Sequence, residues 1–353
     1  MQTSTRNITL TFAAVIVILA GFMAAKSIIL PILLALFISI ICTQPILWLE
    51  KRKVPYTLAI VIVLSGVACV LILFGSIIGR SISNFMGDLP RYEANLRNIF
   101  AASIDRLDNI SGFDIDSNQL VDMLDPGRII SFTTGAVGEF GRIMSDSFII
   151  LLITIFILLE AKSFIKKATI IRRLHKISID HLDKIAHSIR HYLSLKTVIS
   201  ALTGLFIWVW LLIQGVEYAI LWGVIAFLLN YIPNIGSIIA AVPTSLLSML
   251  QFGWGGMLWT ILGYLFVNTV MGNIVEPKII GRGLGLSTLV VFLSLIIWGF
   301  IFGPVGMFLS VPLTMTFKII LEERDKTKWI ATLLGDEHEA KQLLKKTNEV
   351  EAM

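Results

Sequence analysis

Four asparagines are the side chains of this 353-residue sequence best suited to hydrogen-bond a solute inside apolar surroundings. They share residues 197–275, where Glu217 is the only charged residue, and they are Asn230, Asn234, Asn268 and Asn273. A carboxamide donates and accepts at once, so such a set suits a neutral, hydroxyl-rich solute. A buried amide costs free energy unless it is hydrogen-bonded, so bonds to neighbouring helices are the alternative interpretation of any single asparagine. Together the four predict a polar but nearly uncharged path.

Proline and glycine break two apolar segments of the same region, residues 219–250 and 286–320. Each arm of the first segment is too short to cross a hydrocarbon core of about 30 Å. Proline removes an amide donor, and glycine permits backbone angles that no helix uses. We therefore expect two re-entrant helical hairpins, whose breaks are shaped by Pro233, Gly236, Gly303, Pro304 and Gly306.

The two breaks continue into similar sequences. GSIIAAVP at residues 236–243 is echoed by GMFLSVP at residues 306–312, one residue shorter. Paired apolar segments interrupted in this way are the best pointer in a sequence to the binding site of a transporter. Two kinked packing helices without a transport role are the less favoured alternative.

Glu276 is the one carboxylate beside this region that could carry a proton or a cation. Pairing with Lys278 or Arg282 at the membrane interface is the interpretation that we favour. His187 and His191 have a spacing that can bind zinc, but no carboxylate or cysteine completes a set, so we expect a solvated basic face. No P-loop and no Ser-His-Asp pattern occurs, so we expect no enzyme activity, no metal and no cofactor.

The composition indicates which solvent surrounds these residues. The chain is 56% hydrophobic and only 15% charged, whereas soluble domains are about a quarter charged. This balance excludes a disordered chain, a disulfide scaffold and a typical soluble enzyme. We predict an all-α polytopic membrane protein with two broken hairpins and about six full spans, at residues 8–25, 28–49, 58–79, 147–159 with its flanks, 197–215 and 257–275.

Charge orients these spans and divides the chain. Residues 80–142 hold six arginines and nine acidic residues, whereas residues 161–196 hold nine basic residues and two aspartates. The positive-inside rule places the second segment in the cytoplasm, together with both termini and the tail that contains Lys318. We expect spans one to three in 1–79, an extracytoplasmic helical lobe in 80–146, span four in 147–160, a basic cytoplasmic helical segment in 161–196, the transport core in 197–320 and a cytoplasmic tail in 321–353.

The sequence from Gly272 to Pro312, with GNIVEPKIIGRGLGLSTLVVF at its start, resembles the autoinducer-2 exporter family, in particular its quorum-signal exporter type. NYIPNIG at residues 230–236 is the family's other signature, and the resemblance covers the whole chain. It implies a bacterial inner-membrane protein that exports the small sugar-derived signal autoinducer-2. It also implies a homo-oligomer, a pentamer, in which the hairpin region moves against a scaffold. Where many members have an acidic residue before Gly-Asn, this chain has Met271, which weakens ion coupling at that position.

Three functions are compatible with the residues. The leading hypothesis is export of a small neutral solute by alternating access at the two hairpins. The alternative is a sodium/proton antiporter that uses Glu276, and the third is a membrane scaffold whose outer lobe or basic segment binds a partner. The expected partners are the lipid bilayer, the signal molecule and further copies of the chain, and not nucleic acid, because the basic residues cluster beside the apolar runs.

Overall fold

The structure is a computed structural model in which every regular element of the described residues is a helix. These residues form two compact units, of which unit 1 comprises Met1–Ser65, Phe148–Thr197 and Pro277–Met353, and unit 2 comprises Gly66–Ser147 and Val198–Glu276. The described residues are 13–14, 16–111, 146–164, 166–167, 169–170, 180–233, 235–280, 285–323, 326–337, 340–341 and 344.

Six helices of the described residues are long and apolar enough to cross a membrane, which confirms the predicted all-α polytopic membrane class. The N-terminal part of α3 (Tyr56–Ser111) and most of α6 (Asp180–Gln214) supply two of these spans. The six segments are Lys26–Lys51 (α2), Tyr56–Asp88, Asp146–Phe164, Lys184–Gln214, Gly236–Ile279 and Pro304–Glu322 (α11).

The number of spans agrees with the prediction, but their identities differ. The first predicted span, residues 8–25, lies partly outside the described residues, of which 13–14 and 16–24 are helical. Because the span could be compared only in part, it stays a prediction. Conversely α11, predicted as an arm of a re-entrant hairpin, is 19 residues long and about 28 Å in length, enough for a span. Length alone therefore does not separate a hairpin arm from a span in this part of the chain.

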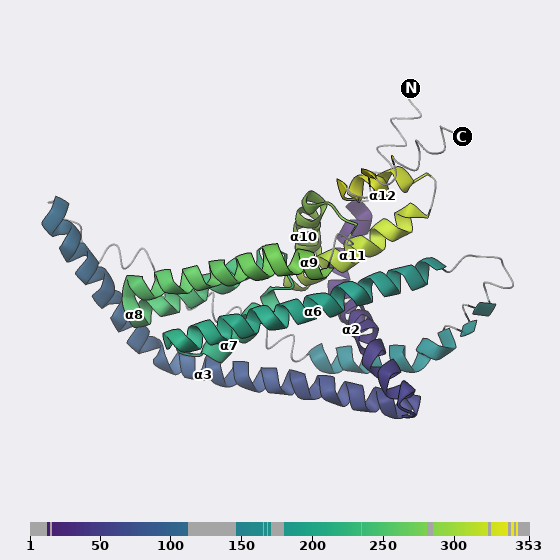
Figure 1. Cartoon of the computed structure of the whole chain (residues 1–353), viewed down its shortest axis with the longest axis horizontal. Coiled ribbons are helices and arrows are strands. Elements are labelled where there is room, and N and C mark those ends of the chain that lie inside the picture. Colours follow the sequence, from purple (N-terminus) through teal and green to yellow (C-terminus); the bar gives the residue numbers. More distant parts are fainter. Residues whose placement is uncertain are drawn as a thin grey trace, which may run out of the picture. The chain divides into compact units, whose positions relative to one another are not determined.

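The polar segment after the third predicted span is a continuation of the same helix. Figure 1 shows α3 as one uninterrupted helix from Tyr56 to Ser111, although Pro90 lies within it. The first part of the predicted extracytoplasmic helical lobe, up to Ser111, is therefore helical without a break from the span before it. The rest of the predicted outer lobe, residues 112–145, lies outside the described residues.

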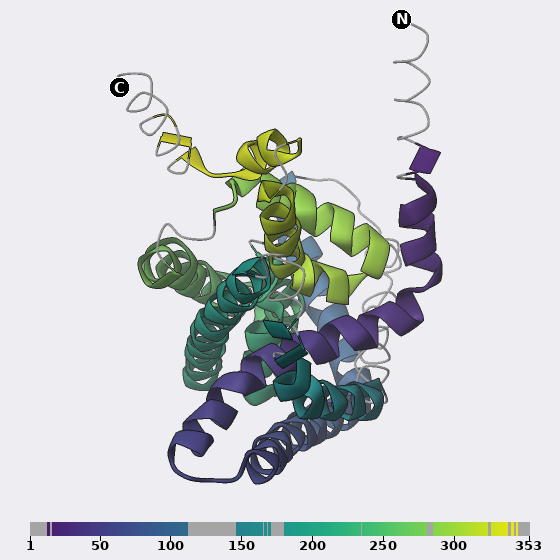
Figure 2. The same ribbon diagram turned by 90° about the vertical axis from the view of Figure 1, so that its right-hand side faces the viewer.

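Unit 1 is built around the second predicted hairpin. α10 (Thr288–Phe302) and α11 meet at Gly303, and Figure 2 shows these yellow-green helices side by side. Gly303 has φ +71°, a backbone conformation that favours glycine, and Pro304 opens α11 where its missing N–H is not needed. α12 (Lys328–Leu334) packs on α11.

A buried lysine of this hairpin binds the backbone just before α10, at Gly285. Lys318 on α11 is only 5% exposed, and its Nζ donates to the carbonyl oxygen of Gly285 at 2.5 Å. Glu322 lies one turn further, with an oxygen 3.6 Å from this Nζ and another 2.7 Å from Nζ of Lys184. Lys318 was predicted on the cytoplasmic side, and its burial inside unit 1 leaves that prediction untested; a charge buried there needs these partners.

Unit 2 contains the first predicted hairpin. α7 (Ala219–Leu229) ends at the NYIPNIG break, and α8 (Gly236–Asn268) begins after it and packs against α7. α6 approaches α7 closely because two glycines face each other, so that a Cβ on Gly204 would lie 2.6 Å from the carbonyl oxygen of Gly223. Small residues at such crossings let helix backbones pack tightly in membranes.

α8 folds back on itself within unit 2. Gly253 has φ +70° and ψ −163°, which no helix contains, and it separates an arm that ends at Phe252 from a second arm. The hydroxyls of Thr244 and Tyr264 meet at 3.0 Å across the two arms, so the arms run antiparallel. The second arm continues into the π-helix η1 (Thr269–Val275) and the short helix α9 (Glu276–Ile280). This reversal agrees with the prediction of a hairpin followed by a separate span at residues 257–275.

Both predicted hairpins close through the same contact. A Cβ on Gly236 would lie far inside 3.0 Å of the carbonyl oxygen of Leu229, and a Cβ on Gly306 would lie equally close to that of Trp298. In each hairpin the first turn of the second arm therefore rests on the last turn of the first arm. The glycines that the sequence repeat aligns have the same structural role.

Replacement of either glycine by alanine is expected to destabilise the protein. The added methyl meets backbone rather than a flexible side chain, so Gly236→Ala and Gly306→Ala should each cost at least about 1–3 kcal/mol. Thermal unfolding in detergent measures this as a lower melting temperature. Gly255→Ala is the control, because that glycine is helical and a Cβ there meets nothing within 4 Å, so the melting temperature should stay or rise. Equal melting temperatures for all three variants would contradict the proposed closure.

Candidate functional site

A small pocket with a mainly apolar lining and a few hydroxyl and amide groups lies inside unit 2, near the break between α7 and α8. It encloses about 210 Å³ including its open mouth, and the space inside holds roughly one water molecule. Three helices provide its walls, and the lining residues are Thr203, Ile207, Ala226, Ser237, Tyr264, Val267 and Asn268. The lining contains hydroxyl groups and one carboxamide but no charged side chain.

The hydrogen bonds around the pocket leave two hydroxyl oxygens at its wall that can still accept a hydrogen bond. The hydroxyl of Thr244 donates to the carbonyl oxygen of Ala240 at 2.8 Å, so in the 3.0 Å contact with Tyr264 the tyrosine must be the donor. The phenolic oxygen of Tyr264 then keeps its capacity to accept. Thr203 likewise donates within α6, to the carbonyl oxygen of Ile199 at 2.9 Å. A solute hydroxyl can therefore donate to either oxygen.

Asn268 joins the pocket to the π-helix. It is the last residue of α8 and the N-cap of η1, and a Cβ on Gly272 would lie 3.5 Å from its Oδ1. π-helical turns are rare and are frequently found at functional sites. Here the π-helix covers Gly272 and Asn273, the start of the GNIVEP sequence. That motif thus lies directly beside a wall of the pocket.

The predicted path residues have different environments. Asn268 lines the pocket, and half-buried Asn230 donates from Nδ2 to the buried Oγ of Ser200 at 2.9 Å. Asn273 is exposed on η1 and is not in the pocket lining, and Asn234 lies outside the described residues.

Glu276 is half-buried at the start of α9, is not in the lining and takes part in a polar interaction. The break residues of the second hairpin belong to unit 1 and those of the first to unit 2.

No motif of the sequence points to the hydroxyl residues of the pocket. Thr203, Ser237 and Tyr264 are common residue types at unremarkable positions of apolar helices, so no local pattern distinguishes them. Only the reversal of α8 at Gly253 brings the start of one arm, at Ser237, level with the end of the other, at Asn268. The serine, threonine and tyrosine hydroxyls of α8 were the one feature of the sequence that could have indicated a polar site there.

A glutamine fastens both arms of α8 to α6. Nε2 of Gln214 donates to Oγ of Ser248 at 2.9 Å and to the carbonyl oxygen of Gly256 at 2.8 Å. Its Oε1 accepts from the hydroxyl of Thr260 at 3.0 Å. The carboxamide is therefore used on both sides, and it holds the arms on either side of Gly253. We call Gln214, Ser248, Gly256 and Thr260 the glutamine clasp.

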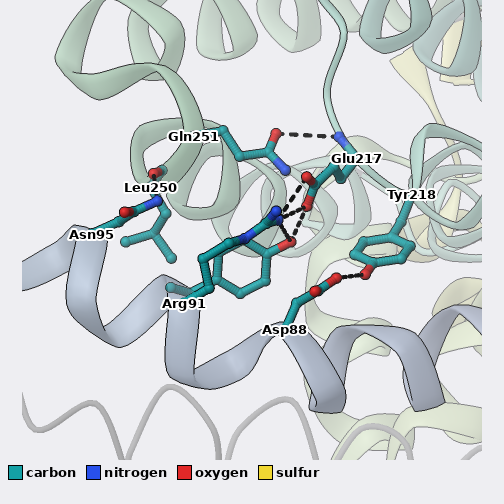
Figure 3. A network of polar contacts seen from close by, with 8 residues as sticks. Asp88, Arg91, Asn95, Glu217, Tyr218, Leu250 and Gln251 are labelled. Atoms are coloured by element: carbon teal, nitrogen blue, oxygen red, sulfur yellow. Dashed lines mark hydrogen bonds and ion pairs between the residues drawn. The ribbon is translucent and has the colours of Figure 1, made fainter.

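A charged network lies at the end of unit 2 where α6 turns into α7. Figure 3 shows Arg91 and Asp88 projecting from α3 toward this turn, and Asn95 projecting toward Leu250 on α8. Nη2 of Arg91 lies 2.7 Å from both carboxylate oxygens of Glu217, which also accepts from the buried hydroxyl of Tyr92.

Further contacts of the same network, which we call the Glu217 network, reach α8 and the next residue of the turn. The backbone N–H of Glu217 donates to Oε1 of Gln251 at 3.2 Å, and Asn95 donates to the carbonyl oxygen of Leu250 at 3.2 Å. Tyr218 donates to a carboxylate oxygen of Asp88. Three segments that are distant in sequence are thus joined beside the Gly253 break (Figure 3).

The network shifts the protonation equilibria of its members. Burial acts to raise the pKa of Glu217, but hydrogen bonds from Tyr92 and Arg91 and the charge of Arg91 outweigh it, so the pKa lies below its ordinary value. Burial, followed by the hydrogen bond to Glu217, raises the pKa of Tyr92 to about 12. Burial, followed by the hydrogen bond to Asp88, likewise raises the pKa of Tyr218. The carboxylate therefore stays ionised and the phenols stay neutral at physiological pH.

Comparison with known proteins shows similarity over nearly the whole chain. The sequence profile of the AI-2E family transporters matches residues 12–325. A relative from Haemophilus influenzae is 39% identical over 339 residues, which cover 93% of this chain and 95% of the relative. The AI-2 transport protein TqsA of Escherichia coli is 38% identical over 94% of this chain and 96% of its own length. YhhT of Escherichia coli is 36% identical over 93% and 94%, respectively.

Neutralising Glu217 is expected to lower stability in a pH-dependent way. A depressed carboxyl pKa contributes stability above the pKa of the unfolded chain, about 4.3, and this contribution is lost as pH falls through the folded pKa. Glu217→Gln should lower the melting temperature at pH 7 by roughly a few degrees, because the exposed part of the pair is screened by solvent. The difference from wild type should shrink as the pH falls below about 4.

The matched control is Glu337→Gln, because Glu337 also forms an ion pair, with Lys341 at 2.6 Å, but both side chains are largely exposed. It should leave the melting temperature almost unchanged. A Glu217→Gln variant as stable as this control at pH 7 would show that the Glu217 network does not hold the turn.

Proposed function

The chain belongs to the AI-2E transporter family, and on this basis we propose that it exports a small neutral polar solute, the signal autoinducer-2, across the bacterial inner membrane. The observation that carries the proposal is the pocket of unit 2, which offers hydroxyls and the Asn268 carboxamide without a charged side chain. Such a lining can donate to and accept from a hydroxyl-rich molecule, and it spares the cost of burying an ion. TqsA, whose name describes AI-2 transport, supports the choice of solute.

Transport by alternating access requires the pocket to change shape. It holds roughly one water molecule, so a sugar-sized solute enters only after the walls separate. Two of its neighbours suit such a rearrangement, the NYIPNIG break that ends α7 and the π-helix that begins after Asn268. A π-helix can rewind to an α-helix by exchanging hydrogen-bond partners within the helix. We propose that these two elements open and close the pocket.

The antiporter alternative has less support. A coupling site needs a titrating carboxylate at the binding position, and neither Glu276 nor any other acid is among the pocket residues. The orientation with both termini in the cytoplasm and the assembly into a homo-oligomer, a pentamer by resemblance, remain parts of the proposal. The basic segment at residues 161–196 supports the orientation.

Efflux from vesicles tests the proposal. Proteoliposomes that contain the purified protein should release labelled autoinducer-2 faster than protein-free vesicles. Loss of one hydrogen bond to the solute should raise KM about 2- to 10-fold in Asn268→Ala and in Tyr264→Phe. Asn84→Ala is the control, because Asn84 is exposed on α3 and is not in the pocket lining, and it should transport as wild type does.

Four outcomes are informative. Release no faster than from protein-free vesicles would refute the choice of solute. A KM unchanged in Asn268→Ala and Tyr264→Phe would refute the choice of pocket, whereas an Asn273→Ala effect as large as that of Asn268→Ala would extend the path over the exposed side of η1. Sodium-dependent proton flux that disappears in Glu276→Gln would favour the antiporter.

A further inference from the structure

The interior of unit 2 contains polar atoms that the fold does not use. Among the described residues, five buried side-chain nitrogen or oxygen atoms have no hydrogen-bond partner, and four of them belong to unit 2. These four are Nε1 of Trp208, Nε1 of Trp222, Oγ of Ser245 and Nε2 of Gln251. An unpaired buried donor costs free energy, and in native proteins each such atom needs an explanation.

Three of these atoms belong to residues at nearly the same height on three neighbouring helices, whereas Gln251 belongs to the Glu217 network. In the antiparallel hairpin that closes between Leu229 and Gly236, Trp222 is seven residues before the closure and Ser245 is nine after it, a difference of about 3 Å. Trp208 is level with them, because a Cβ on Gly223 would lie 2.7 Å from the Cβ of Trp208. Trp222 and Ser245 are 5% and 3% exposed, so both are inside the unit.

This level lies between the pocket and the glutamine clasp. Trp222 is one turn of α7, about 6 Å, from the pocket residue Ala226. In the other direction Ser245 is one turn of α8 from Ser248 of the clasp. Hydrogen-bonding groups thus follow one another along unit 2, from the pocket through the unpaired atoms to the clasp. Of these three levels, only the middle one holds fully buried side-chain nitrogen or oxygen atoms without a partner in the described part of the chain.

We propose that Trp208, Trp222 and Ser245 form a second hydrogen-bonding subsite on the solute path, which the transported solute occupies after it leaves the pocket. The inference rests on the proposed function and deepens it. An indole N–H can only donate, so the subsite recognises acceptor oxygens, such as those of carbonyl and hydroxyl groups. A bare cation needs acceptor ligands, and two of the three groups offer none. The subsite therefore favours an oxygen-rich solute over a bare cation.

A pair of serine variants separates binding from stability. Ser245→Ala removes a hydroxyl without a partner, so the melting temperature should stay or rise, whereas KM for autoinducer-2 efflux should rise about 2- to 10-fold. Ser248→Ala, one turn further along α8, removes a hydroxyl that accepts from Gln214 at 2.9 Å. It should lower the melting temperature and leave KM unchanged. Opposite effects of two neighbouring substitutions are not expected from packing alone.

Trp222→Phe provides an independent variant, since it removes the indole N–H and keeps an aromatic ring. It should raise KM by a similar factor, and it should reduce the rise in melting temperature that saturating autoinducer-2 causes in wild type. Trp329→Phe, at an exposed tryptophan of α12 in unit 1, should change neither quantity.

The failures are distinguishable. Wild-type vesicles that move no autoinducer-2 would overturn the proposed function and the subsite with it. Wild-type transport with an unchanged KM in both Ser245→Ala and Trp222→Phe would overturn the subsite and leave the pocket in place. A melting temperature lowered by Ser245→Ala as much as by Ser248→Ala would assign the Ser245 hydroxyl a structural partner and would also overturn the subsite.

Discussion

The contact of a glycine with a carbonyl in the last turns of the preceding helix is the constraint on which both hairpins depend. A chain that turns within apolar surroundings must pair its backbone groups internally, because no water is present to pair them. At the first turn the N–H of Ile232 donates to Leu229 and that of Gly236 donates to Ile232, at 2.8 and 3.2 Å. The ladder therefore continues through the break, and the arms start close enough for α7 and α8 to share one pocket. Any Cβ at Gly236 would push them apart.

Once the arms are close, the chemistry of the interior follows from the cost of burying charge. Threonine, serine, tyrosine and asparagine supply the polar groups of the pocket and its surroundings, and each can be satisfied by a neutral partner. The charges gather at the end of the unit, where Glu217 is paired with Arg91 and Tyr92 (Figure 3). A neutral interior with charged ends suits a neutral solute, because the solute need not exchange an ion's hydration shell for protein groups.

The two hairpins share a closure but differ in what they bury. The second arm of the first hairpin carries neutral hydroxyls, whereas α11 carries Lys318, whose charge is paired with Glu322 on the same helix and with the carbonyl oxygen of Gly285. Repeats of one design therefore serve different purposes. In unit 2 the arm lines a pocket, and in unit 1 the arm holds the backbone at Gly285, just before α10.

The sequence by itself determined the membrane class, the two breaks and their repeated glycines, the neutral character of residues 197–275 and the family, because each is a property of composition or of local spacing. Only the tertiary structure decided that Asn268 lines a pocket while Asn273 is exposed, that Lys318 is buried, and that Thr203, Ser237 and Tyr264 meet. The physical reason is that the sequence predicts the two arms on either side of Gly253 but not the register in which they pack, which the backbone angles at Gly253 set. Which polar side chains share a cavity depends on that fold-back, and not on their separation along the chain.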